Sequence, residues 1–314
     1  MLTRPHVFLC ADFDKDIAVE YVSDVILYGQ KKATTVIQAA DFAFKQHFSF
    51  PFSVVYGLSP VFKGDNDTIA SPFYQNWRDG HFKSPYAAYH WCYGNHSRKT
   101  CKGADALQTL GYYDPSLIDG DIEWYDNIDS TTTNVNSVDF VYDPAIYNYW
   151  MLELSRLAMG SKVYALNDTL TPAAVFDHAS YGRGAPISRT LYADLIQRTN
   201  ATQVTLAEPP NNGPQKTYAF NCANAARLPP LHYTFKGSTR TWSSPAKHWV
   251  VETTDSANVD AEKSCIFDVR VVTDLPNGGG DSFDIGNFGE TFLKDKYIVF
   301  DFDRLRIGLA KLRI

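Results

Sequence analysis

The carboxyl end of the chain, residues 281–314, constrains the fold more than any other stretch of the sequence. Residues 287–289 read Asn-Phe-Gly, and a glycine reached directly from an apolar run marks a place where another segment can pass closely. Residues 297–300 fit helix or strand by period alone, but their β-branched and aromatic side chains favour a buried strand. Residues 301–304 then turn the chain, and residues 307–310 return as a partner strand. We therefore expect a β-hairpin here.

The order of these features carries a resemblance. An apolar-apolar-Gly segment, Phe-Leu, Tyr-x-Val-Phe-Asp and an Ile-Gly-Leu-Ala strand follow one another with a spacing that resembles the carboxyl end of pepsin-like aspartic peptidases. The resemblance implies a mostly β, bilobal fold. It also implies that the segment bearing Gly289 frames a loop that carries one catalytic aspartate.

Length and composition agree with such a fold. The 314 residues suffice for two lobes, and 45% hydrophobic with 20% charged residues is typical of a globular protein. Valine, tyrosine, phenylalanine and threonine are frequent, which favours β structure. A formal net charge of -6 argues against nucleic acid as a partner. No apolar run approaches the length of a membrane span, so we expect none.

The candidate catalytic aspartate lies in the second half of the chain. Trp150, Leu152 and Leu154 alternate onto one face, as in a strand. Residues 173–180 then read Ala-Ala-Val-Phe-Asp-His-Ala-Ser, followed by Pro186 and by Ser188, which is placed to cap a short helix.

In the family this passage is apolar-apolar-Asp-Thr-Gly-Thr-Ser, a proline and a helix. The resemblance therefore places Asp177 at the catalytic position, with His178 and Ala179 where the family has threonine and glycine. Ala179, Ser180 and Tyr181 become candidate ligand-binding residues. His178 is either a second catalytic group or a loop residue that only fills space.

Residues 8–29 predict two strands around a polar turn and resemble the family's flap hairpin, which closes over bound peptide. The family carries a tyrosine and glycines near the flap tip. Here the equivalent positions hold Asp12, Phe13 and Lys15, so Asp12 and Phe13 are candidate ligand-binding residues. A plain solvated β-turn is the alternative.

The first half also shows an internal counterpart of the carboxyl end. Residues 50–58 repeat the apolar-apolar-Gly-Leu pattern, as an internally duplicated fold would. Residues 71–80 and 84–91 each begin with Ser-Pro, which predicts two helix starts. Residues 111–122 resemble the family's connection between lobes.

The lobe boundary is expected in the polar stretch 127–139. We therefore assign residues 1–138 to an amino-terminal lobe with the flap hairpin, and residues 139–314 to a carboxyl-terminal lobe with Asp177. Because Met1 falls just before the flap, the amino-terminal lobe is expected to be incomplete.

Aspartic peptidases need two carboxylates that share one proton, because one must be ionised to activate water while the other polarises the scissile carbonyl. The first carboxylate should precede the flap in an Asp-Thr-Gly loop. The sequence contains no Asp-Thr-Gly or Asp-Ser-Gly triplet. We therefore expect no ordinary peptidase activity from this chain alone.

The cysteines bear on the compartment. Cys92 and Cys101 bracket a polar turn that one disulfide could close, and Cys222 and Cys265 match a disulfide usual in the carboxyl lobe of the family. Buried reduced thiols in a cytosolic protein are the alternative. Glycosylation-type triplets occur at four asparagines: Asn66, Asn95, Asn167 and Asn200. The amino-terminal residues lack the apolar core of a signal peptide, so secretory ancestry is expected while a cytoplasmic address stays open.

Other chemistries find no support. The eight histidines show no paired metal spacing and no cysteine pair is close enough for zinc, so we expect no metal and no cofactor. Residues 276–280 are Gly-rich but lack the lysine and hydroxyl residue of a phosphate loop. No Gly-x-Ser-x-Gly motif occurs.

Three functions stay open. In the first, the chain would bind a peptide or small molecule in the inherited cleft without cutting it. In the second, Asp177, with His178, would perform general acid–base chemistry on a non-peptide substrate. In the third, the chain would be a fragment of an ordinary aspartic endopeptidase. An incomplete amino-terminal lobe would also expose sheet edges, which predicts self-association or acceptance of a strand from a partner.

Overall fold

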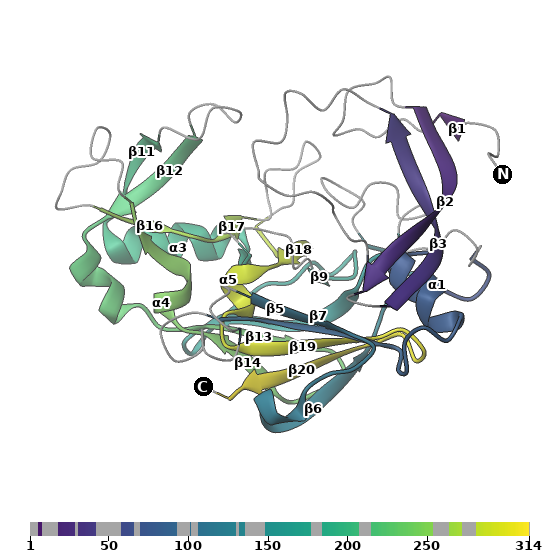
Figure 1. The fold of residues 1–314 in the computed structure, drawn as a ribbon. Coiled ribbons are helices and arrows are strands. Elements are labelled where there is room, and N and C mark those ends of the chain that lie inside the picture. Colours follow the sequence, from purple (N-terminus) through teal and green to yellow (C-terminus); the bar gives the residue numbers. More distant parts are fainter. Residues whose placement is uncertain are drawn as a thin grey trace.

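The computed structural model of the chain has a mostly β architecture (Figure 1). The structure describes thirteen stretches of the sequence, and all statements below concern them: 6–7, 18–28, 31–41, 58–65, 70–92, 101, 106–129, 132–135, 148–176, 184–206, 215–253, 264–271 and 281–313. The strands at residues 6–7, 18–28 and 31–41 are described by their backbone alone. The predicted mostly β fold class is confirmed.

One antiparallel sheet joins the end of the chain to its first half. Its strand order is β5-β4-β19-β20-β6. The strands span Ala106–Leu110 (β5), Tyr86–Trp91 (β4), Lys296–Asp301 (β19), Arg306–Leu312 (β20) and Ile118–Asp126 (β6). The predicted carboxyl-terminal hairpin is therefore confirmed, and it forms the middle of a sheet whose other strands come from residues 86–126.

The carboxylate of Asp301 stabilises the turn of this hairpin by accepting three hydrogen bonds. The backbone N–H groups of Asp303 and Arg304 donate to Oδ1 of Asp301 at 3.2 and 3.1 Å, and Arg306 donates to its Oδ2 at 2.8 Å. Asp301 is 1% exposed, so these donors satisfy a carboxylate that burial alone would make costly.

A second sheet forms the floor of the candidate site. Its main path is β14-β13-β7-β9-β18, with β8 paired to β7. The strands span Thr241–Ser244 (β14), Leu231–Phe235 (β13), Met151–Met159 (β7), Lys162–Tyr164 (β8), Ala173–Phe176 (β9) and Ile285–Phe288 (β18). Strands β9 and β18 pair in parallel, whereas β7 pairs antiparallel with β9.

Three smaller sheets lie around these two. A four-stranded sheet, β11-β12-β16-β15, spans Thr202–Leu206, Gln215–Phe220, Cys265–Phe267 and Val250–Glu252. A parallel pair joins Pro186–Ile187 (β10) to Arg270–Val271 (β17). The antiparallel sheet β1-β2-β3 spans His6–Val7, Ala18–Tyr28 and Lys31–Asp41. In Figure 1, β1–β3 stand at one side and β11 and β12 at the other, with β9 and β18 between them.

The helices are short. They span Pro72–Arg78 (α1), Arg189–Thr199 (α3), Ala246–Trp249 (α4) and Glu290–Leu293 (α5), with 3-10 turns at Pro115–Leu117 and Cys222–Arg227. The predicted start of α3 is confirmed, because Ser188 Oγ accepts the N–H of Leu191 at 3.3 Å. The predicted start at Ser71 and Pro72 is confirmed as well.

The helix start predicted at residues 84–91 is wrong, because residues 86–91 form β4. This strand lies between β5 and β19, and residues Ala87 to His90 are all buried. A strand covered on both faces shows no polar–apolar alternation, so its sequence does not announce a strand.

Trp150 is one of the residues that link the first half of the chain to the floor of the site. Trp150, which precedes β7, donates from Nε1 to the carbonyl of Leu58 at 2.6 Å and stacks on Phe300 of β19 at 4.9 Å. Trp150 and Leu58 are both buried. The strand alternation predicted for Trp150, Leu152 and Leu154 is confirmed, since all three lie in the core. Among the described helices, none has the length and apolar character needed to cross a membrane.

Candidate functional site

The site is built on two parallel strands whose carboxyl ends lie side by side. Residues Phe176 of β9 and Phe288 of β18 are register partners, and every residue of both strands is buried. The N–H of Phe176 also donates to Trp150 O at 2.8 Å. Because β9 ends at Phe176, Asp177 follows directly from a strand that neighbours hold on both sides.

The chain returns to the same place after residues 177–183. The N–H of Gly289 donates to Gly184 O at 3.0 Å, so Phe176 and Gly184 contact consecutive residues of one segment. A Cβ added to Gly184 would lie 2.6 Å from the carbonyl carbon of Gly289. Only glycine fits this approach. The close passage predicted at Gly289 is thereby confirmed, and both ends of the segment that carries Asp177 are fixed.

A buried threonine adds a second hold on Gly184. Thr291, which is fully buried in α5, accepts the N–H of Gly184 at its Oγ1 at 3.2 Å. The same hydroxyl donates to Asp268 Oδ2 at 2.8 Å. Because the hydroxyl proton of Thr291 points to Asp268, the lone pairs of its oxygen can accept the N–H of Gly184. Asp268 therefore orients the hydroxyl that anchors Gly184.

A tyrosine holds Pro186, two residues after Gly184. Tyr233 of β13 is fully buried, and its hydroxyl donates to Pro186 O at 3.1 Å. Burial raises the pKa of Tyr233 far above its ordinary value, so the hydroxyl keeps its proton and remains a donor at every working pH. Pro186 in turn occupies the space beside Gly286, where a Cβ would lie 2.3 Å from the proline ring.

An aromatic cluster supports these anchors from below. Ring centroids of Phe288 and Phe292 lie 4.9 Å apart, and Tyr233 lies 4.9 Å from Phe288, both in edge-on geometry. Phe176 lies 5.6 Å from Phe288, and Phe235 closes the group at 5.8 Å from Phe176. Large rings in such contacts give rigid support to the ends of β9 and β18, where Phe176 and Phe288 lie.

The candidate site residues themselves lie outside the described residues. This holds for Asp177, His178, Ala179, Ser180 and Tyr181, which fall between Phe176 and Gly184. It holds equally for Asp12 and Phe13. These two fall between β1 and β2, which pair antiparallel with His6 opposite Val19. Their roles stay predictions.

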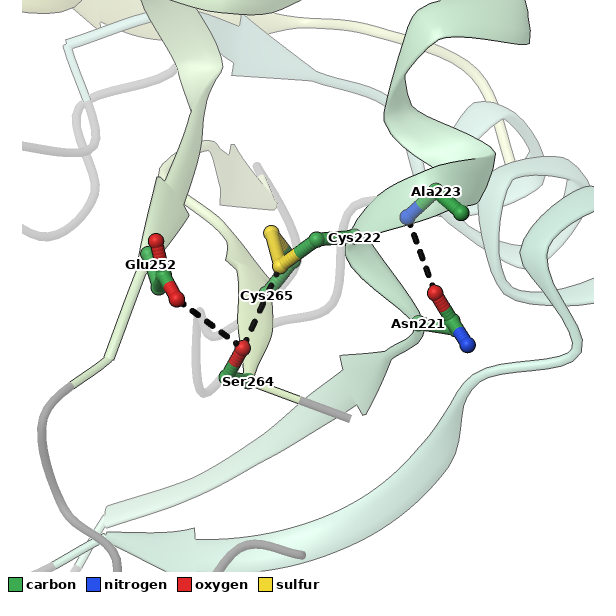
Figure 2. Close-up of a disulfide and its surroundings, with 6 residues drawn as sticks. All are labelled: Asn221, Cys222, Ala223, Glu252, Ser264 and Cys265. Atoms are coloured by element: carbon green, nitrogen blue, oxygen red, sulfur yellow. Dashed lines mark hydrogen bonds between the residues drawn. A yellow bond between two sulfur atoms is a disulfide. The ribbon is translucent and has the colours of Figure 1, made fainter. Parts of the chain in front are cut away.

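Both expected disulfides are present. Cys92 and Cys101 are joined with their Cα atoms 6.2 Å apart, and Cys222 and Cys265 with theirs 5.1 Å apart. Figure 2 shows the second bridge, where Ser264 Oγ lies 3.3 Å from Cys222 Sγ and contacts Glu252. It fastens β16 to the 3-10 turn after β12, so Asp268 leaves a tethered strand. The alternative of reduced thiols is wrong for these four cysteines.

Among the described residues, one group of three donors has metal-ligand proximity: His90, Cys92 and Cys101, whose donor atoms lie within 4.8 Å of one another. His90 Nε2 lies 3.6 Å from Cys101 Sγ, and burial lowers the pKa of His90, so its imidazole is neutral. Both sulfurs belong to a disulfide, which offers no thiolate to a metal. The group is therefore a packed disulfide with a histidine neighbour.

Sequence reasoning missed three supporting residues: Thr291, Asp268 and Tyr233. A glycine two positions before Thr291 indicated a close approach, but no local pattern indicates which hydroxyl meets which N–H. Asp268 is 23 residues from Thr291 in the sequence, and no motif pairs the two. Gly184 was missed as well; the signal that could have indicated it is the glycine itself, because glycine permits a close backbone approach.

Comparisons with known proteins agree with this geometry. The family model of the eukaryotic aspartyl proteases matches residues 30–312. The aspartic protease-like protein pynH of Aspergillus niger is 44% identical over 305 residues, 95% of this chain and 70% of that protein. The aspartic protease-like protein pytH of Aspergillus terreus is 41% identical over 315 residues, which cover 95% of this chain and 72% of that protein.

A probable secreted aspartic protease of Arthroderma benhamiae is 39% identical over 309 residues, 96% of this chain and 72% of that protein. The hairpin β19–β20, the parallel pair β9–β18 and the close passage of Gly184 by Gly289 stand within the matched residues. The chain therefore belongs to the eukaryotic aspartyl protease family, the pepsin-like aspartic peptidases.

Proposed function

We propose that this chain binds a peptide or peptide-like small molecule at residues 177–183 and does not cleave it. One observation carries the proposal. Gly184 lies against Gly289 at the end of the segment, within the residues that the family model matches, yet Asp177 is followed by His178 and Ala179 where the resemblance expects threonine and glycine. This contact supports binding, and the altered triplet supports loss of the peptidase step.

The chemistry gives the reason. A threonine hydroxyl after the catalytic aspartate hydrogen-bonds its counterpart loop, and glycine lets the two loops approach. An imidazole and a methyl group change both contacts at once. Residues 1–314 hold no Asp-Thr-Gly or Asp-Ser-Gly triplet that would provide a second carboxylate of the usual kind. A lone carboxylate cannot be ionised and protonated together.

The test measures binding and cleavage on the same preparation. A pepstatin-type inhibitor is titrated by calorimetry at pH 4 and pH 7, and a mixed peptide pool is followed by mass spectrometry. Binding without cleavage is the expected result. Cleavage that the inhibitor blocks and that Asp177→Asn abolishes would overturn the proposal. The matched variant His178→Thr/Ala179→Gly restores the family triplet and shows whether these two positions alone silence the site.

A second candidate rests on His178. An imidazole beside an aspartate can pass a proton near neutral pH, which suits a dehydration, a cyclisation or a proton shift on a non-peptide substrate. A metabolite that wild type converts, and that Asp177→Asn and His178→Gln both leave unchanged, would favour this function over binding alone.

The proposal includes two lobes, residues 1–138 and 139–314, and passage through the secretory pathway. The lobes are supported by the sheets, since β7, β9, β13 and β18 all lie beyond residue 139; the shared sheet β5-β4-β19-β20-β6 would then link them. Secretion is supported by two disulfides and by the relative named as secreted. Limited proteolysis that cuts first at residues 127–139 tests the boundary.

A further inference from the structure

Two of the four Asn-x-Thr/Ser triplets lie in described residues, and their environments differ. Asn167 and Asn200 are each followed two residues later by a threonine, Thr169 and Thr202. Attachment of an oligosaccharide to such an asparagine requires that the amide nitrogen face solvent with space around it, because the product is bulky and hydrated. We propose that Asn200, rather than Asn167, carries an N-linked glycan; the inference rests on the proposed secretory passage.

Asn200 stands at the end of α3 in an open position. Its backbone is left-handed, with φ 52° and ψ 43°, and its N–H donates to Gln197 O at 3.3 Å. The residue is exposed, and within the described part of the chain no hydrogen bond involves its side-chain amide. Asparagine fits this helix-end conformation, and the main chain alone closes the helix. The amide nitrogen therefore has no structural task.

The surroundings of Asn200 leave room for a sugar chain. Strand β11 begins at Thr202 and pairs with β12, and it is the terminal strand of the order β11-β12-β16-β15. Thr202 and Gln203 are exposed. Among the described strands, a glycan on Asn200 would thus project beside the terminal strand of this sheet.

Asn167 is occupied by the fold instead. Its Oδ1 accepts three hydrogen bonds, from Thr169 N at 2.9 Å, Thr169 Oγ1 at 2.9 Å and Leu170 N at 2.8 Å. Its own N–H donates to Phe283 O at 2.6 Å, and the residue is half-buried. The side-chain oxygen of Asn167 is therefore fixed in a turn between β8 and β9, and this fixes the orientation of the whole amide group.

The modification balances without a redox step. Nδ2 of Asn200 forms a bond to the anomeric carbon of a lipid-linked diphosphate oligosaccharide. The bond between that carbon and the diphosphate breaks, and the amide proton passes to a base of the transferring enzyme. Thr202 supplies the hydroxyl that the triplet requires, so Thr202→Ser keeps the site and Thr202→Ala removes it.

The experiment secretes the full chain from a fungal host behind a cleavable leader, so that occupancy reports on the site and not on the native address. Peptides containing Asn200 and Asn167 are quantified by mass spectrometry after enzymatic release of glycans in heavy-oxygen water. We expect occupancy at Asn200 several-fold above that at Asn167. Occupancy at Asn200 equal to or below that at Asn167, or absent, would overturn the proposal.

Variants separate the modification from folding. Asn200→Gln and Thr202→Ala should each lose the Asn200 glycan, while Thr202→Ser should retain it. Asn200→Gly suits the left-handed helix end better than glutamine, so it removes the amide and preserves the fold. Retention of a glycan-sized mass on the peptide of the Thr202→Ala variant would contradict the assignment. Secretion of unglycosylated wild type at full yield would contradict it equally.

Discussion

The backbones of Gly184 and Gly289 touch, and no side chain fits between them. A Cβ on Gly184 would lie 2.6 Å from the carbonyl carbon and 2.7 Å from the Cα of Gly289. Backbone atoms cannot rotate away as a flexible side chain can. The contact fixes the end of the segment that carries Asp177 against β18, so it links the fold to the proposed binding site.

Gly184→Ala is expected to destabilise the protein by about 3 kcal/mol, as an overpacked core does, and to weaken binding of a pepstatin-type ligand. Gly120→Ala is the control, because no atom lies near the position of its added Cβ. Its positive φ of 85° should lower the free energy of unfolding by about 1 kcal/mol. Urea unfolding of both variants measures the difference. Equal losses would show that the Gly184 contact yields easily.

Thr291→Val should cost about 1–3 kcal/mol, because it removes the hydroxyl that accepts from Gly184 N–H and donates to Asp268. Thr291→Ser keeps the hydroxyl and should recover most of this loss. Hydrogen exchange in the peptide covering residues 177–183 is the decisive readout. Faster exchange in Thr291→Val, with Thr291→Ser near wild type, shows a positioning role, whereas unchanged exchange limits Thr291 to core packing.

Stability should fall with acid because of His248. Burial lowers the pKa of His248 to about 4, opposed by Asp295, whose carboxylate lies 4.0 Å away, and aided by Lys296, Lys294 and Lys247. The unfolded histidine titrates near pH 6.5, so the unfolded chain binds more protons between pH 6.5 and pH 4. The free energy of unfolding is therefore highest above about pH 6.5, where His248 is neutral in both states, and it decreases as the pH falls to about 4.

The loss amounts to roughly 2–3 kcal/mol for a group this buried. His248→Gln removes the titration and should flatten the slope of unfolding free energy against pH in that window. The measurement compares urea unfolding of wild type and variant at intervals from pH 4 to pH 8. Parallel curves for the two proteins would contradict the assignment.

The two disulfides should contribute unequally. Chain-entropy arguments assign about 2.5 kcal/mol to the bridge with a sequence separation of 9, Cys92–Cys101, and about 4 kcal/mol to the bridge with a separation of 43, Cys222–Cys265. The matched double-alanine variants, unfolded in guanidinium, test the order. A larger loss from Cys92→Ala/Cys101→Ala would show that native packing around His90, rather than loop length, decides the contribution.

Much of the fold was predictable because local and family patterns agree at the carboxyl end. Residues 297–300 and 307–310 carry the β-branched and aromatic content of strands, and they form β19 and β20. Ser188 followed by Leu191 and Leu195 gives a capped amphipathic helix, and α3 follows. The helix start predicted at residues 84–91 was wrong because the strand at residues 86–91 is buried on both faces and shows no polar–apolar alternation.

The site was predictable at one anchor point. The glycine after an apolar run, Gly289, indicates a close passage, but no motif in the sequence indicates that its partner is Gly184. The pairings of Thr291 with Asp268 and of Tyr233 with Pro186 join residues distant in the chain. Such pairs depend on how sheets and helices pack, which no local spacing encodes. Asp177, His178, Asp12 and Phe13 lie outside the described residues, so their roles stay predictions.

The placement of β19 and β20 has a consequence for biosynthesis. Both strands lie in the interior of their sheet, between β4 and β6, yet a ribosome translates them long after those two neighbours. Strands β4, β5 and β6 must therefore wait, without their central partners, until almost all of the described sequence has emerged. Until then the nascent chain exposes strand edges that later become paired, and a premature stop codon before residue 296 would leave β4 and β6 without the two strands that lie between them.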